Sequence, residues 1–131
     1  MGFTHLRAYS GYSARFGASL PDVLAERAAE RGLDALAVTD RDTVAGVVRF
    51  AKACARVGVR PLFGVDLAVP EYLDPAAAVG ERRRSPVRGG AFVDESAPRV
   101  RFPARNRVGW AAVCRLITAA HADPDAKPAL S

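Results

Sequence analysis

Extended and helical apolar patterns alternate along the first 69 residues, and this alternation restricts the fold more than any other feature of the sequence. Strand-like runs lie at 3–9, 33–39 and 59–69, and helical periodicity lies between them, over about 20–31 and 44–57. The run 33–39 is almost continuously apolar, which is typical of a strand covered on both faces. Strands joined through helices are parallel and have right-handed crossovers. We therefore predict an α/β fold of parallel β-α-β units.

Capping residues mark the ends of the two predicted helices. Ser19 is a suitable N-cap, because its hydroxyl can accept a hydrogen bond from a free amide of the first turn. Gly32 and Gly58 follow the two helices and permit the left-handed backbone that ends a helix. The apolar faces of these helices are predicted to cover the sheet. They comprise Leu20, Val23, Leu24 and Ala28 in the first helix, and Val44, Val47, Val48, Ala51 and Ala55 in the second.

The pattern changes after residue 69, and the chain divides into four parts. Residues 1–69 form the predicted core, and 70–98, rich in Arg, Pro and Gly, is interpreted as a long flexible insertion. A strand at 99–103 and a helix over about 108–121 place residues 99–122 back in the fold. That helix is predicted to bury Trp110, Val113, Ile117 and Ala120. Residues 123–131 are predicted to be a frayed tail.

The net charge of +5 is concentrated in one part of the chain. Residues 81–107 contain eight arginines and three acidic residues, so the excess charge lies within this stretch. A basic segment of this kind can contact DNA phosphates without sequence preference, or it can be a solvated loop. Few aromatic residues are interleaved for base stacking, which favours the loop. The candidates for phosphate contact are Arg82, Arg83, Arg84 and Arg88.

Cysteine content and hydropathy indicate in which cellular compartment the protein is located. Cys54 and Cys114 do not form a disulfide framework or zinc-ligand spacing, and both are predicted to be buried, inert thiols. No apolar run reaches the roughly 18 residues that a membrane span needs, and the first residues lack the layout of a secretion signal. A cytoplasmic location without a membrane partner is therefore expected.

Polar side chains follow each predicted strand of the core. In parallel α/β folds, ligands bind at the carboxyl ends of the strands, where the loops converge. Carboxylates from different strands could hold Mg²⁺ or Mn²⁺ there, or they could serve as helix caps and ion-paired groups. The residues alone leave both interpretations open. The side chains at these strand ends are Arg7, Tyr9 and Ser10, then Asp40, Arg41 and Asp42, and finally Asp66.

Four blocks in this order carry a resemblance to a known family. They are THLRAYSGYS at 4–13 with FGAS at 16–19, ALAVTDRD at 35–42, VRFAKA at 48–53 with RPLFGVD at 60–66, and GWAAVCRLITAAH at 109–121. They resemble the polymerase and histidinol phosphatase (PHP) domain at the N-terminus of bacterial family C polymerases, the DNA polymerase III alpha chain, and most closely its accessory, error-prone type. The resemblance implies a partial distorted β/α barrel, about the first half of the domain. It also implies a place in a DNA-directed DNA polymerase, a nucleotidyltransferase of DNA replication or repair.

The resemblance assigns specific positions to metal ligands, and most of them are replaced here. Active PHP sites bind divalent metals through an HxH pair, a following Asp, a His after Thr-Asp and an acidic residue after the third strand. Arg7 and Tyr9 stand at the HxH positions, Phe16 at the Asp and Arg41 at the His. Asp40 and Asp66 are the retained positions, with Asp where Glu is usual. His5, just before the HxH pair, is interpreted as a strand residue.

The replacements suggest a scaffold rather than a reaction centre. A guanidinium keeps its proton and cannot coordinate a metal. Our hypothesis is that Arg7 and Arg41 pair with Asp40 and Asp66 and hold the loops without catalysis. No cofactor is then expected, and Mg²⁺, Mn²⁺ or Zn²⁺ would bind only if the degenerate site retains affinity.

The expected function is a non-catalytic PHP segment of an alpha-type polymerase, with the remainder of that chain or its replication partners as the binding partner. Two alternatives stay open: a metal-dependent PHP phosphoesterase or 3'-5' exonuclease, and a stand-alone interaction module that docks on a polymerase. Half of a barrel would expose unpaired strand edges, which favours association with another chain.

Overall fold

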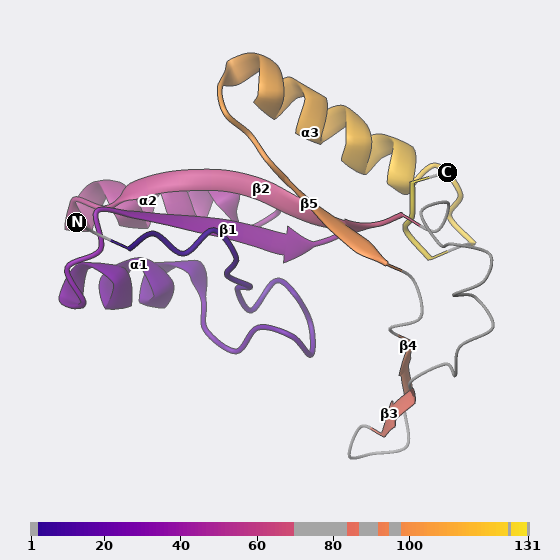
Figure 1. Ribbon diagram of the computed structural model, residues 1–131, viewed down its shortest axis with the longest axis horizontal. Coiled ribbons are helices and arrows are strands. Elements are labelled where there is room, and N and C mark those ends of the chain that lie inside the picture. Colours follow the sequence, from indigo (N-terminus) through magenta and orange to yellow (C-terminus); the bar gives the residue numbers. More distant parts are fainter. Residues whose placement is uncertain (1–2, 70–83, 87–91, 95–97, 126, 131) are drawn as a thin grey trace.

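The computed structural model describes residues 3–69, 84–86, 92–94, 98–125 and 127–130, and it confirms a mixed α/β architecture (Figure 1). The main sheet has the strand order β1-β2-β5, and β3 and β4 form a separate two-stranded sheet. The described elements are α1 (Pro21–Glu30), β1 (Ala35–Arg41), α2 (Val47–Val57), β2 (Arg60–Ala68), β3 (Arg84–Pro86), β4 (Phe92–Asp94), β5 (Arg99–Pro103) and α3 (Arg107–Ala120).

The predicted parallel pair is present as β1 and β2, which are connected through α2. Their register places Ala35 opposite Arg60 and Arg41 opposite Asp66. The predicted first strand at 3–9 is shorter than expected. It runs alongside β1 with a single bridge between His5 and Leu36, because the chain turns away into the loop that begins at Ser10.

The strand at 99–103 is present, but its direction departs from the all-parallel expectation. β5 runs antiparallel to β2, with Arg101 opposite Asp66 and Arg99 opposite Ala68. A parallel return would need a crossover helix, and no helix lies between β2 and β5 in the part of the chain that the structure describes. The antiparallel return places two arginine side chains next to the end of β2.

The helices have the predicted ends at their C-termini but not at the start of α1. Gly32 and Gly58 have φ values of +66° and +76°, which confirms both predicted helix stops. Leu20, and not Ser19, is the N-cap of α1, and it makes no side-chain capping bond. The carbonyl of Ser19 instead accepts a hydrogen bond from the Gly11 amide at 2.7 Å, so its backbone closes the preceding loop.

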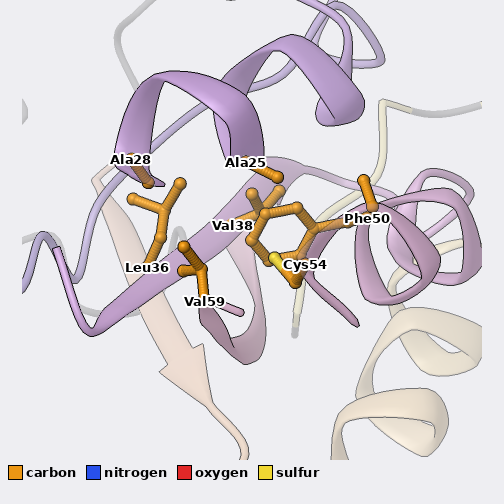
Figure 2. Close-up of a cluster of buried hydrophobic side chains, with 8 residues drawn as sticks. Ala25, Ala28, Leu36, Val38, Phe50, Cys54 and Val59 are labelled. Carbon is orange, nitrogen blue, oxygen red and sulfur yellow. The ribbon is translucent and has the colours of Figure 1, made fainter. Parts of the chain in front are cut away.

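The first core cluster lies between α1, α2 and β1 (Figure 2). In α2 the buried residues are Phe50, Ala53 and Cys54, whereas Val48, on the predicted apolar face, is 63% exposed. The helix has two apolar stripes, and burying the stripe with the large phenyl ring removes more apolar surface from water. Burial also raises the pKa of the Cys54 thiol to about 11, in agreement with the prediction that it is inert.

The buried face of α1 also differs from the predicted one. Pro21, Ala25 and Ala28 are buried, whereas Leu20 and Val23 are 44% and 41% exposed. Two small alanines at the interface let α1 pack closely on its neighbours, and the larger side chains remain at its border. The predicted apolar face is therefore correct at Ala28 and wrong at Leu20 and Val23.

A second core cluster lies between β2, β5 and α3. Val65, Leu67 and Val113 are buried in it, and Leu130 of the predicted frayed tail packs against them. The Leu130 amide also donates to the carbonyl of Ala68 at 2.9 Å. This part of the tail thus contacts the core. Cys114, predicted to be buried, is only partly so.

The register separates the two faces of the sheet. Val38 lies opposite Phe63, and Val65 and Leu67 follow Phe63 at intervals of two. Both core clusters, and with them the three helices of the described residues, therefore occupy one face. The other face carries Asp66. Among the described residues, no helix is long and apolar enough to cross a lipid bilayer.

Candidate functional site

The two retained acidic positions lie at the carboxyl ends of neighbouring strands, but they do not share a face. Asp40 is opposite Val65 in the register, whereas Asp66 is opposite Arg41. Because side chains alternate along a strand, Asp40 and Asp66 leave the sheet on opposite sides. Both are buried, with 2% and 0% exposure, so each must be satisfied by its own set of donors.

Asp40 is bound by the loop that follows the first extended segment. The Ser10 amide donates to Oδ1 at 2.7 Å, the Ser10 hydroxyl to Oδ2 at 2.6 Å, and the Ser13 hydroxyl to Oδ1 at 2.6 Å. The Ser13 hydroxyl in turn accepts from the Arg41 amide at 2.9 Å. Asp40 therefore ties the loop to the end of β1 through neutral donors.

Gly17 allows this loop to close. Its amide donates to the Ser13 carbonyl at 3.0 Å, and a Cβ at this position would lie 2.0 Å from the carbonyl oxygen of Ser10. No side chain fits at that distance, so the close approach of the two backbone segments requires glycine. The serines that bind Asp40 depend on this approach for their position.

Asp66 is bound by cationic and phenolic donors from distant segments. Arg99 Nε donates to Oδ1 at 2.6 Å, and the Tyr9 hydroxyl donates to Oδ2 at 2.5 Å. Arg101 Nη2 lies 3.4 Å from Oδ2 and donates to the Tyr9 hydroxyl oxygen at 3.2 Å. These contacts connect the first extended segment, β2 and β5 at one point.

Asp42 extends the network from the end of β1. Its Oδ1 accepts from Arg99 Nη2 at 2.7 Å, its amide donates to the Asp66 carbonyl at 2.9 Å, and its own carbonyl lies 2.7 Å from Nε2 of His121. Asp42 has φ of +60°, a left-handed conformation that aspartate tolerates better than most residues. The turn after β1 is thus held to β2, β5 and the end of α3.

Arg99 remains charged in this environment. Burial disfavours its protonated form, but the hydrogen bonds to Asp42 and Asp66 outweigh that effect, so the pKa of Arg99 lies above its ordinary value. A guanidinium shared between two carboxylates at 2.6–2.7 Å forms strong charge-assisted hydrogen bonds.

The four replaced ligand positions form a stack of cations and rings. The Arg41 guanidinium carbon lies 3.6 Å from the centroid of the Phe16 ring, Phe16 meets Tyr9 edge-to-face at 6.3 Å, and Arg7 lies 5.7 Å over Tyr9. Burial and the nearby charge of Arg99 lower the pKa of Arg41. A cation over a ring face is stabilised by the ring quadrupole.

The predicted guanidinium–carboxylate pairs are therefore present, but Arg7 and Arg41 are not the arginines that make them. The guanidinium–carboxylate pairs are made by Arg99 and Arg101, which belong to the basic stretch 81–107 and are not among the predicted site residues. The arginine–valine–arginine alternation at 99–101 indicates that both arginines share one face of a strand. No local feature of the sequence indicates the direction of that strand relative to β2, although this direction decides which residues the two arginines face.

The donor set does not fit the divalent metal cluster that the PHP family implies. Both carboxylate oxygens of Asp40 and of Asp66 already have hydrogen-bond partners. Arg101 Nε is buried without an acceptor, so N–H and O–H donors outnumber acceptor atoms around Asp66. In the described ranges, no group of three or more His, Cys, Asp or Glu side chains could hold a metal ion. Hard cations need several oxygen ligands, and here arginines surround the carboxylate instead.

Nothing in the structure tests the proposed phosphate contacts. Arg82, Arg83 and Arg88 lie outside the described residues. Arg84 is the first residue of β3, where it pairs with Asp94 through the backbone, and its side chain is not described. The DNA contact stays a prediction.

Comparison with known proteins gives the family. The PHP domain family matches residues 5–131. The error-prone DNA polymerase of Mycobacterium bovis is 38% identical over 121 residues, which are 92% of this chain and 10% of that protein. That of Nocardia farcinica is 35% identical over 140 residues, covering 91% of this chain and 12% of that protein. The chain thus spans about a tenth of the length of these curated relatives.

A solved structure gives the same fold. An amidohydrolase from Chromobacterium violaceum superposes with a TM-score of 0.53 at 23% identity, and the match covers 86% of this chain and 32% of that one. At this identity the likeness concerns the fold alone. The match of the PHP domain family over residues 5–131 establishes that the chain belongs to this family.

Proposed function

We propose that this chain is the PHP segment of a family C DNA polymerase of the error-prone type, and that it is a non-catalytic scaffold in DNA replication or damage-tolerant synthesis. The support is the 35–38% identity to error-prone DNA polymerases over more than nine-tenths of the chain. The partners would be the remainder of such a polymerase or its replication proteins, in the bacterial cytoplasm where the chromosome lies. Any DNA contact by Arg82, Arg83, Arg84 and Arg88 belongs to this proposal.

The binding of Asp66 is the observation that carries the scaffold assignment. Its carboxylate accepts from Arg99 and Tyr9, and Arg101 lies at 3.4 Å. A metal ion would have to displace a guanidinium that two carboxylates hold. The same contacts hold three segments of the chain together, which is what a scaffold requires.

A metal-content measurement tests the scaffold role. The purified chain, equilibrated with Mn²⁺ and Zn²⁺ and then desalted, should contain metal at the background level of its Asp123→Ala variant, which alters an exposed tail carboxylate. Phosphatase and 3'-5' exonuclease activity with added Mn²⁺ should also be at background. Stoichiometric metal that is lost on Asp40→Ala, together with turnover, would instead support the metal-dependent phosphoesterase or exonuclease.

The length of the native polypeptide tests the polymerase assignment separately. An antibody against this chain should detect a polypeptide several times longer in the source cells, because the curated relatives are about ten times as long. A native polypeptide of the same mass as this chain, 13.9 kDa, would contradict the assignment and support the stand-alone interaction module.

A further inference from the structure

An apolar groove lies on the helix-covered side of the sheet, away from the site around Asp66. It has a volume of about 780 Å³ and runs between α2 and the first turn of α3, over the start of β2. Val48 of α2, Phe63 of β2 and Trp110 of α3 line it. Phe63 and Trp110 meet edge-to-face at 5.9 Å, so the two rings form a continuous apolar surface.

The groove exists because this stretch of β2 is incompletely covered. Helix α2 precedes β2 and helix α3 follows β5, and no described helix lies between them on this face. Val48 is consequently 63% exposed, although it belongs to a helix whose other side enters the core. An exposed apolar surface of this kind, bordered by polar groups, is typical of a binding site.

The rim of the groove is cationic. Arg60, Arg105 and Arg107 line it and are exposed, and no acidic residue lines it. Within the described residues, none of the three arginines has a carboxylate within ion-pair distance, whereas five other arginines of the chain do. Three guanidiniums without counter-charge around an apolar floor are complementary to a ligand that is apolar on one side and acidic on its flanks.

The backbone around the groove offers few groups to an added strand. β2 is hydrogen-bonded to β1 along one edge, Pro61 has no N–H to donate, and the Phe63 carbonyl already accepts from the Ala104 amide at 2.8 Å. We therefore expect a ligand to bind through its side chains. A helix between two flanking helices satisfies this requirement, because its own backbone is internally hydrogen-bonded.

We propose that this groove binds an acidic amphipathic helix of a partner protein. The apolar face of that helix lies on Phe63 and Trp110, and its carboxylates face Arg60, Arg105 and Arg107. The inference does not depend on the polymerase assignment or on the absence of a metal.

Trp110 provides a direct measurement, because it is the only tryptophan in the sequence. The probe is a synthetic helical peptide of about four turns, with leucines at i, i+3, i+4 and i+7 and glutamates elsewhere. It should shift the Trp110 emission to shorter wavelength, with a Kd of about 10–100 µM that rises with salt. The same peptide with lysines in place of the glutamates should bind at least about tenfold more weakly.

Charge reversal on the rim distinguishes groove binding from non-specific attraction. The double variant Arg105→Glu/Arg107→Glu should lose at least about tenfold in affinity for the glutamate peptide and gain affinity for the lysine peptide. Arg31→Glu, at the exposed C-cap of α1, is the matched control and should change affinity less than about twofold. Circular dichroism of each variant verifies its fold.

Three outcomes would overturn the proposal. They are an unchanged Trp110 emission with both peptides, equal binding of the glutamate and lysine peptides, and equal losses in the groove and control variants. Sedimentation of the chain alone provides a further test, because a dimer that Trp110→Ala dissociates would assign the groove to a second copy. None of these results affects the metal measurement, so failure here is distinguishable from failure of the proposed function.

Discussion

Asp40 and Asp66 hold equivalent places at the ends of adjacent parallel strands, yet they are satisfied in different ways. Asp40 accepts from two serines and an amide of one short loop, all of them neutral donors. Asp66 accepts from Arg99 and Tyr9, with Arg101 nearby, so its partners come from two other segments and include two cations. One retained acid thus fastens a loop, whereas the other joins β2 to β5.

Removal of Asp66 is expected to have the largest effect. Asp66→Ala leaves the Arg99 guanidinium half-buried with only Asp42 as its carboxylate partner, and loss of one member of a buried ion pair costs about 3–5 kcal/mol. The midpoint of urea unfolding should fall accordingly. Asp66→Asn, which retains the shape and one acceptor oxygen, should lose less. Equal losses in the two variants would mean that the cost is steric and not electrostatic.

Removal of Asp40 should cost less, because its donors are neutral and all belong to one short loop. Asp40→Ala leaves the Ser10 and Ser13 hydroxyls without their acceptor, and we expect a loss of about 2–3 kcal/mol in the free energy of unfolding. Amide exchange should rise at Ser10 and through the loop but stay unchanged in β5. Increased exchange in β5 would contradict the division between the two acids.

Gly17→Ala tests the loop without touching either acid. The added methyl group would lie 2.0 Å from the Ser10 carbonyl, and overpacking of this kind typically costs about 1–3 kcal/mol. Gly11→Ala is the matched control, since its nearest neighbour would be 3.5 Å away, and it should change the unfolding free energy by less than about 0.5 kcal/mol. Comparable effects in both variants would show that the loop is not fastened at Ser10.

The sequence predicts the fold where the signal is local. The apolar run at 33–39, the run at 59–69 and the glycines after the two helices are sufficient for β1, β2 and both helix stops, because each depends on neighbouring residues. The buried side of α2 is not predictable in this way. Val48 and Phe50 give competing stripes, and the choice depends on what the rest of the chain presents to the helix.

The site shows the same limit more strongly. Asp40 and Asp66 can be identified from their strand ends, and Ser10 from its loop. Arg99 and Arg101 reach Asp66 because β5 returns antiparallel, and that pairing joins residues separated by the whole segment 70–98. An alternating strand pattern fixes which residues share a face, but it contains no information on which acid that face meets.

Tyr9→Phe is expected to have the smallest effect and is the sharpest test of the network around Asp66. The variant removes one hydroxyl and keeps the ring against Phe16. The hydrogen bond to Asp66 is lost together with the longer one from Arg101, at a cost of about 1–2 kcal/mol that comes mainly from the bond to the charged acceptor. In a double-mutant cycle with Asp66→Asn, this cost should fall to below about half, because the acceptor is then neutral.

Tyr9→Phe combined with Asp40→Asn is the control. The two losses should be additive, since Tyr9 makes no hydrogen bond to Asp40 in the described structure. Coupling of Tyr9 to Asp40 as strong as its coupling to Asp66 would mean that the two acids act as one site, as they would in a metal centre, and the distinction between loop fastening and strand joining would fail.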